Sequence, residues 1–226
     1  MVKVKQVSLC ALAQEIIDIS CEMNRLGINV NKSGNVSCRA WINGSAGFLI
    51  TPTGIPYEEL EVEDLVFIPL TACSLDEFEF SRLPSSEWLM HAEIYRQKAN
   101  VKAIVHTHSV YATALACQDL GIPAFHYMVA VAGGTDIPCA PYALFGTAEL
   151  ACNCAITLKE RKACLLSHHG VVATGDNLIS ALKLAHEVEN LAKTYTVVRQ
   201  LGEPKILTDE QMLAVIERFK TYGKQK

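Results

Sequence analysis

Two pairs of histidines in this sequence have the spacing of metal ligands. His106 and His108 are separated by one residue at the end of an apolar run, Val101 to Val105, which is typical of a buried strand. Side chains two apart on a strand point to the same face, so both imidazoles can reach one ion. His168 and His169 follow a second apolar run. Adjacent residues of an extended chain point in opposite directions, so only one of them can join that ion. Three imidazoles would leave one coordination position open, as in catalytic zinc sites.

Both pairs also have a structural interpretation, because histidines at strand ends can be satisfied by backbone hydrogen bonds. The spacing alone leaves this alternative open for His106 and His108, and it does not choose between His168 and His169. The remaining histidines considered are isolated, and we expect them to be structural: His91, His126 and His186.

Three short polar turns could together bind a phosphate group. Glu87 follows Ser85 and Ser86 near the expected start of a helix, where unpaired backbone amides attract anions. Gly34 in "SGNVSCR" and Gly54 in "TPTG" would let the backbone come close to a ligand. Each turn alone has an ordinary structural explanation. Together they predict a phosphate pocket built without lysine or arginine.

The composition of the chain excludes several classes of protein. Its 226 residues are 50% apolar and carry a formal net charge of −4, so no basic surface indicates nucleic-acid binding. No apolar stretch approaches the roughly 20 residues that a membrane span needs. The nine cysteines include no Cys-x-x-Cys pair of a structural zinc site. We therefore expect free, mostly buried thiols in a cytoplasmic protein, where the environment is reducing.

Helices and short strands must position these groups. Apolar spacing predicts helices over residues 9–26, 84–98, 110–117, 147–160, 177–200 and 208–223. Strands are expected at 34–41 and 47–54, which flank a turn and predict a hairpin, and at 64–70, 101–108 and 162–170. The serine pair should cap the second helix, while Thr208 should cap the last helix and Gly223 should end it.

The order of these elements predicts the fold class. Helices flank several short strands without strict alternation, which favours an α/β layer structure with a mixed, largely antiparallel central sheet. No repeat or linker divides the sequence, so we expect a single domain over residues 1–226.

The ordered set of motifs resembles the class II aldolase/adducin family. The matching stretches run nearly end to end: "EMNRLGIN", "GNVSCR", "LITPTGIPYEEL", "LPSSEW", "IVHTHSV", "IPAFHYM", "AGGTDIPCAPYALFGT", "LLSHHG", "LAHEVE" and "FKTYG". One departure is the turn "INGSAG", which is a few residues longer than the family pattern. Within the family, "HYM", "APYALFGT" and "FKTYG" are most similar to aldolases that cleave L-fuculose 1-phosphate into dihydroxyacetone phosphate and L-lactaldehyde.

The resemblance implies a role for individual residues. It implies one zinc ion per subunit, bound by Glu87, His106, His108 and His169, so it selects His169 over His168, which should point away. It implies that phosphate is bound by Gly34, Asn35, Thr53, Gly54, Ser85 and Ser86.

The resemblance also implies how substrate is handled. Glu87 would leave the metal as substrate binds and would then move the proton at C3. Tyr127 would reach the active site of a neighbouring subunit in a homotetramer and exchange a proton with the aldehyde oxygen. Phe145 and Tyr222 would line the aldehyde end.

Other functions fit the same fold. An L-ribulose-5-phosphate 4-epimerase or a sugar-phosphate dehydratase would act on a similar small sugar phosphate. A non-catalytic, adducin-like interaction domain is a different class. It is disfavoured because it would not need a complete histidine set together with Glu87. The expected partners are a sugar phosphate and further copies of the chain, with no nucleic acid and no membrane.

Overall fold

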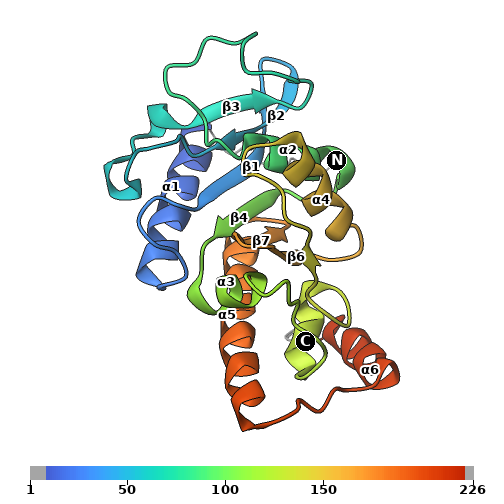
Figure 1. The fold of residues 1–226 in the computed structure, drawn as a ribbon. Helices are drawn as coiled ribbons and strands as arrows, with labels where there is room; N and C mark the ends of the chain where they lie inside the picture. The colour runs from blue at the N-terminus through green and yellow to red at the C-terminus, as the bar shows by residue number, and fades with distance from the viewer. Residues whose placement is uncertain (1–8, 222–226) are drawn as a thin grey trace.

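A computed structural model describes residues 9–221, so the expectations for Tyr222 and Gly223 lie outside the described residues. In this part of the chain, seven strands form one sheet in the order β3-β2-β1-β4-β7-β6-β5 (Figure 1). The strands are β1 Asn35–Ile42, β2 Ser45–Ile50, β3 Val66–Pro69, β4 Ala103–Thr107, β5 Cys139–Ala140, β6 Ala163–Leu166 and β7 Gly170–Gly175. Neighbouring strands are antiparallel except β5 and β6, which are parallel. The expected mixed, largely antiparallel sheet is therefore confirmed.

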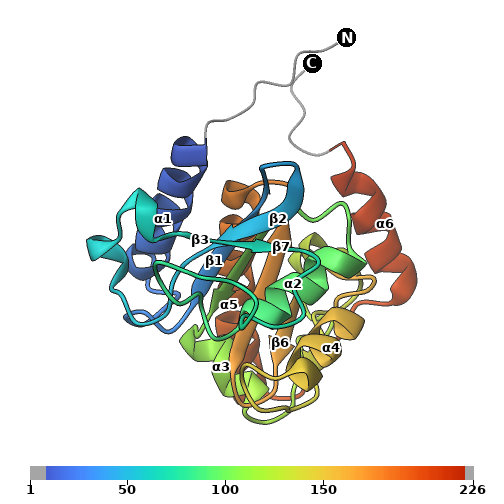
Figure 2. The same ribbon diagram turned by 90° about the horizontal axis from the view of Figure 1, so that it is seen from above.

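Helices cover both faces of this sheet and bury two separate apolar clusters. The first cluster lies under α1 (Leu9–Arg25), α3 (Val110–Ala116) and α5 (Leu178–Leu201). The second lies under α2 (Trp88–Gln97) and α4 (Ala148–Thr157). The last helix, α6 (Asp209–Phe219), packs on the 3-10 helix η3 (Tyr127–Ala132), at the opposite end of the molecule from α1 (Figures 1 and 2).

The central strand β4 carries the first candidate ligand. All five of its residues are buried, because helices cover the sheet on both sides. Val105 belongs to the cluster under α5, whereas Ile104 belongs to the cluster under α2. Since side chains alternate along a strand, His106 shares the face of Ile104 and points toward the α2 side.

The hairpin of β1 and β2 closes more tightly than the sequence suggested. Ile42 already pairs with Ser45, so the expected turn over residues 42–47 shrinks to Asn43 and Gly44. Both residues have positive φ, 50° and 80°, as the two-residue hairpin turn with the matching twist requires. This turn lies at the outer tip of the hairpin.

One expected strand was too long, and two strands were missed. The strand predicted over residues 162–170 ends at Leu166, and Gly170 begins β7, which the sequence interpretation missed together with the two-residue β5. His168 has a φ of 53°, so the two adjacent histidines lie in a turn rather than in an extended strand.

The caps of the helices agree only in part with expectation. Thr208 accepts a hydrogen bond from the Gln211 amide and caps α6, as predicted. The serine pair does not cap α2: the N-cap residue is Glu87, with no side-chain cap bond. Ser85 instead donates its amide to the Thr51 carbonyl, which ties the turn before α2 to the loop after β2.

The structure also tests the expectations for the cysteines and for membrane-spanning helices. All nine cysteines lie in the described part of the chain, and all are free thiols. The expectation that most are buried was wrong: three are buried and four are exposed, because residues such as Cys152 lie on the outer face of their helix. Among the described helices, none combines the length and the apolar character that crossing a membrane requires.

Candidate metal centre

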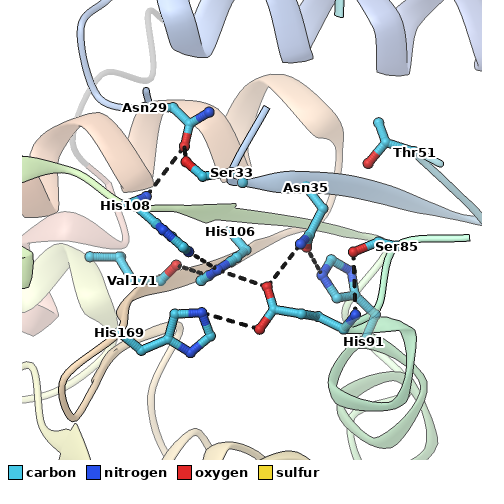
Figure 3. Close-up of polar contacts among 12 residues, drawn as sticks. Asn29, Ser33, Asn35, Thr51, Ser85, His91, His106, His108, His169 and Val171 are labelled. Carbon is cyan, nitrogen blue, oxygen red and sulfur yellow. Dashed lines mark hydrogen bonds and ion pairs between the residues drawn. The ribbon is translucent and has the colours of Figure 1, made fainter. Parts of the chain in front are cut away.

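Four side chains from different elements converge at one point. Glu87 lies at the start of α2, His106 on β4, His108 directly after β4, and His169 in the turn between β6 and β7. One potential ligand atom from each lies within 4.8 Å of all the others (Figure 3). The structure therefore brings together all four residues predicted as metal ligands.

The distances within this cluster suit a small cation. The Glu87 Oε2 atom is 3.0 Å from His106 Nε2, and Oε1 is 3.2 Å from His169 Nε2. The Nε2 atoms of His106 and His108 are 2.9 Å apart. Ligands at zinc distances of 2.0–2.1 Å in a tetrahedron would lie about 3.3 Å from one another. The four groups thus need only small movements to share one ion.

A hydrogen bond fixes the side of the His106 ring that faces the centre. The Nδ1 atom of His106 lies 2.8 Å from the Val171 carbonyl and donates to it, so the lone pair of a neutral His106 is on Nε2. The His108 amide donates to Asn29 Oδ1. Glu87 Oε1 is buried and has no hydrogen-bond donor among the described residues, as expected for an oxygen that binds a cation.

The electrostatics of the cluster favour a charged Glu87 and neutral His108 and His169, which are the forms that bind a metal. Burial raises the pKa of Glu87, but the charge and hydrogen bond of His106, with His169 and Asn35, outweigh burial and hold that pKa well below its usual range. Burial lowers the pKa of His106, yet the neighbouring Glu87 carboxylate outweighs burial and raises it. Burial and the charge of His106 lower the pKa of His108 to about 3 and that of His169 to about 4. His108 and His169 are thus neutral at pH 7.

Two glycines permit this close convergence. A Cβ atom on Gly170 would come within 2.4 Å of the Thr107 carbonyl and 3.0 Å of the His108 ring. A Cβ atom on Gly34 would come within 2.4 Å of the His106 carbonyl. Side chains at either position would push the histidine strand away, so both positions require glycine.

His168 lies outside the cluster, as expected. It is exposed, and its ring packs edge-on against Tyr142 with centroids 6.0 Å apart. Both residues line a cavity of about 260 Å³ that opens onto the metal cluster. Its lining residues are Ser33, Ser86, Glu87, His108, Tyr142, Ala143, Phe145, His168 and His169.

The residues predicted to bind phosphate surround this cavity unevenly. Ser86 lines it, and Gly34 and Asn35 follow the lining residue Ser33. The buried Ser85 accepts a hydrogen bond from the Glu87 amide at 3.3 Å. Thr53 and Gly54 are exposed and do not line the cavity in the described chain.

A lysine lies beside one of the turns that were predicted to bind phosphate. The Nζ atom of Lys32 lies 2.5 Å from the Gly54 carbonyl, so a positive charge sits at the loop that was predicted to bind phosphate. Its neighbours in "NKSGN" are small and polar, which could have identified it from the sequence.

The residues predicted to contact the aldehyde end of the substrate do not all line the cavity. Phe145 lines the cavity and is 63% exposed. Tyr127 is 49% exposed on η3, where it packs against His126 and against Phe219 of α6. Tyr127 does not line the described cavity.

Comparison with known proteins agrees with this geometry. Residues 14–196 match the family model described as the class II aldolase and adducin N-terminal domain. The chain belongs to this family. This class II aldolase family member is 49% identical over 213 residues to the L-fuculose phosphate aldolase of Escherichia coli (strain K12), which covers 94% of this chain and 95% of the relative.

Two further comparisons refine the relationship. A 5-methylthioribulose-1-phosphate/5-deoxyribulose-1-phosphate aldolase of Rhodospirillum rubrum is 47% identical over 216 residues, covering 96% of this chain and 94% of the relative. A solved L-fuculose 1-phosphate aldolase superposes with a TM-score of 0.85 at 38% identity, covering 92% of this chain and 96% of that one. This class II aldolase family member is thus a lyase of the aldolase type, and its family depends on a metal.

Proposed function

We propose that this protein is a zinc-dependent aldolase that reversibly cleaves L-fuculose 1-phosphate to dihydroxyacetone phosphate and L-lactaldehyde. The observation that carries the proposal is the convergence of Glu87 with three imidazoles beside an open cavity, in a chain 49% identical to L-fuculose phosphate aldolases. The converging side chains support metal-dependent cleavage, and the sequence identity supports L-fuculose 1-phosphate as the substrate.

Zinc is the proposed metal, with one ion per subunit. Three imidazoles and one carboxylate form a ligand set that suits zinc, and the buried Glu87 Oε1 atom without a donor supports a cation there. When bound, the ion supplies Lewis-acid stabilisation of the negative charge that cleavage places on the dihydroxyacetone phosphate half.

The chain itself would bind the phosphate and move the protons. We assign phosphate binding to the residues of the three turns: Gly34, Asn35, Thr53, Gly54, Ser85 and Ser86. Glu87 would exchange the proton at C3, because its carboxylate faces the cavity. Phe145, which lines the cavity, would pack against the apolar end of the aldehyde.

The aldehyde end is proposed to need a second subunit. Tyr127 is half-exposed on η3 and lies outside the cavity of its own chain, which supports its insertion into the site of a neighbour in a homotetramer. There its hydroxyl would exchange a proton with the aldehyde oxygen. Tyr222 is assigned to the same region.

A second candidate is a 5-methylthioribulose-1-phosphate/5-deoxyribulose-1-phosphate aldolase. The relative from Rhodospirillum rubrum is 47% identical, close to the 49% of the fuculose enzymes. Both substrates are 1-phosphorylated ketoses, so the same cleavage of the C3–C4 bond would release dihydroxyacetone phosphate. The two activities differ only in the aldehyde that leaves.

One coupled assay separates these activities. Release of dihydroxyacetone phosphate is followed with L-fuculose 1-phosphate, 5-deoxyribulose 1-phosphate and L-ribulose 5-phosphate at equal concentrations. The proposal predicts the highest kcat/KM with L-fuculose 1-phosphate. A higher value with 5-deoxyribulose 1-phosphate would select the second candidate, and epimerisation of L-ribulose 5-phosphate without release would select an epimerase.

We also propose a cytoplasmic location. The nine cysteines are all free thiols, and four of them are exposed. Exposed thiols persist in a reducing compartment, whereas an oxidising one would pair them.

A further inference from the structure

A buried line of polar side chains leads away from Glu87 into the protein, on the side opposite the cavity. The Asn35 Nδ2 atom is 3.0 Å from Glu87 Oε2, and its Oδ1 is 2.5 Å from His91 Nε2 (Figure 3). The His91 Nδ1 atom is 2.6 Å from Ser37 Oγ, which is 2.8 Å from the Tyr95 hydroxyl. We call these five residues the relay.

The relay is sealed from solvent and crosses between two elements. Each of its side chains belongs to a residue that is at most 5% exposed, and His91 and Ser37 are fully buried. Asn35 and Ser37 are two apart on β1, so they share a face of the strand. Glu87, His91 and Tyr95 are four apart on α2, so they share a face of the helix.

The Glu87 carboxylate fixes the direction of the first two hydrogen bonds of the relay. The Glu87 carboxylate can only accept, so Asn35 donates through Nδ2 and must accept through Oδ1. His91 therefore donates from Nε2. Full burial favours the neutral ring at this position, and the Nδ1 atom of that ring then accepts from Ser37 Oγ at 2.6 Å. Ser37 in turn accepts from Tyr95.

This direction has a consequence for the Asn35 amide. If the amide turned over, its oxygen would face the carboxylate oxygen and its NH₂ group would face the His91 donor. Both contacts would then be unsatisfied in a buried place, which is costly. Glu87 and His91 thus together fix the orientation of the Asn35 amide.

We propose that His91, which donates from Nε2, is a positioning residue that holds Glu87 through Asn35. The inference rests on the proposed function, in which Glu87 exchanges a proton with substrate. The relay anchors Oε2, while Oε1 has no hydrogen-bond donor among the described residues and remains available to the metal and substrate. The anchor keeps the carboxylate at the cavity when it leaves the metal.

A direct test is the tautomer of His91 in the metal-loaded wild-type protein. Histidine is labelled with ¹⁵N, and long-range proton–nitrogen correlation spectra assign the ring, with His91→Gln identifying its signals. The expected result is a neutral Nε2–H ring from pH 5 to pH 8. An Nδ1–H tautomer or a charged ring would overturn the inference, whatever substrate the enzyme uses.

Kinetics supply the functional test, with Ser20→Ala as a matched control. Ser20 and Ser37 are both fully buried, but Ser20 donates to the Ile16 carbonyl within α1. We expect His91→Leu to lower kcat about tenfold or more, with KM within about twofold and metal content unchanged. His91→Gln keeps a donor toward Asn35 and should recover much of kcat. Ser37→Ala should lower kcat less, and Ser20→Ala should have no effect.

The outcomes separate this inference from the proposed function. Metal-loaded His91→Leu with the kcat of the wild type would overturn the inference. If His91→Leu does not fold, Ser37→Ala with wild-type kcat and an unchanged His91 tautomer would overturn it instead. A wild-type protein that cleaves neither ketose 1-phosphate would refute the proposed function, while the tautomer measurement would still decide the orientation of the relay.

Discussion

The metal centre and the aldehyde end differ in how completely one chain builds them. Glu87 and His106 are buried, at 5% and 0% exposure. Neighbours in the same chain fix the Glu87 carboxylate and the His106 ring. Tyr127 and Phe145 are 49% and 63% exposed, and only Phe145 reaches the cavity. One region is preorganised and the other is open.

This difference indicates which region would serve the common cleavage step and which would select the substrate. The preorganised region suits the step common to both candidate substrates, cleavage next to a phosphorylated three-carbon half, because fixed groups lose little energy to reorganisation. The open region would contact the part in which the two substrates differ. Relatives 49% and 47% identical to this chain carry different substrate names, as expected if the substrate is selected in the open region.

The largest expected effect separates two adjacent histidines. His169→Ala should lose the metal and lower kcat/KM by at least about 10,000-fold, because a ligand is removed from a site that stabilises the reacting charge. His168→Ala is the matched control and should keep its metal, since His168 packs on Tyr142. Metal analysis and the coupled assay check both variants. Metal-free His168→Ala alongside loaded His169→Ala would reverse the assignment.

The next effect separates the two roles of Glu87. Glu87→Gln should lower kcat about 1,000-fold while retaining metal on the three imidazoles, because an amide cannot exchange the C3 proton. Exchange of the C3 proton of dihydroxyacetone phosphate with deuterated water, followed by NMR, measures this step without an aldehyde. Exchange at the wild-type rate in Glu87→Gln would contradict the role.

A smaller effect is expected in the open region. Tyr127→Phe should lower kcat about 100-fold and leave both metal content and the C3 exchange of dihydroxyacetone phosphate unchanged, because Tyr127 is assigned to the aldehyde oxygen. Mixing and reassembling Tyr127→Phe subunits with Glu87→Gln subunits should recover activity, since some sites then combine an intact Glu87 with a neighbour's intact Tyr127. No recovery in confirmed mixed oligomers would place Tyr127 in its own subunit's site.

The smallest effect concerns the stability of the metal-free protein. Unfolded histidines take up protons near pH 6.5, whereas His91, His108 and His169 stay neutral in the folded chain down to a pKa of about 3, 3 and 4. The unfolded state therefore binds more protons between about pH 4 and 6.5, and stability falls as the pH is lowered through that window. His106, whose pKa is raised, contributes stability that is fully present below about pH 6.5 and is lost as the pH rises from there through its folded pKa.

Urea unfolding of chelator-treated protein measures this dependence. The midpoint should be lower at pH 5 than at pH 7, and His108→Asn should reduce the difference. His186→Asn, at an exposed position of α5, serves as the control and should retain it. A midpoint that does not change between these pH values would contradict the buried neutral state of the three rings.

The sequence predicts the parts of the site that depend on local patterns, but not those that depend on contacts between distant elements. Local patterns predict the helices and the His106–His108 pair well, because a strand's alternation places both side chains on one face. The choice of His169 did not follow from spacing, since His168 and His169 lie in a turn that the sequence interpretation extended as a strand. The start of β7 was missed because Gly170 had been included in that strand.

The role of His91 was hidden for a different reason. An isolated histidine on a helix is ordinary, and only the packing of α2 against β1 brings it to Asn35. The spacing of Glu87, His91 and Tyr95 by four residues was the available signal, but it gains meaning only when β1 is known to lie beside α2. Contacts between elements distant in the sequence are therefore what the sequence alone did not provide.

Activity before and after metal removal tests the proposed zinc dependence most directly. Release of dihydroxyacetone phosphate from L-fuculose 1-phosphate is measured on the purified protein, after chelation, and after zinc is restored, with metal content determined at each stage. A zinc-dependent aldolase should contain about one zinc ion per chain, lose activity on chelation and recover it with zinc. Metal-free protein that cleaves the substrate at the original rate would contradict it.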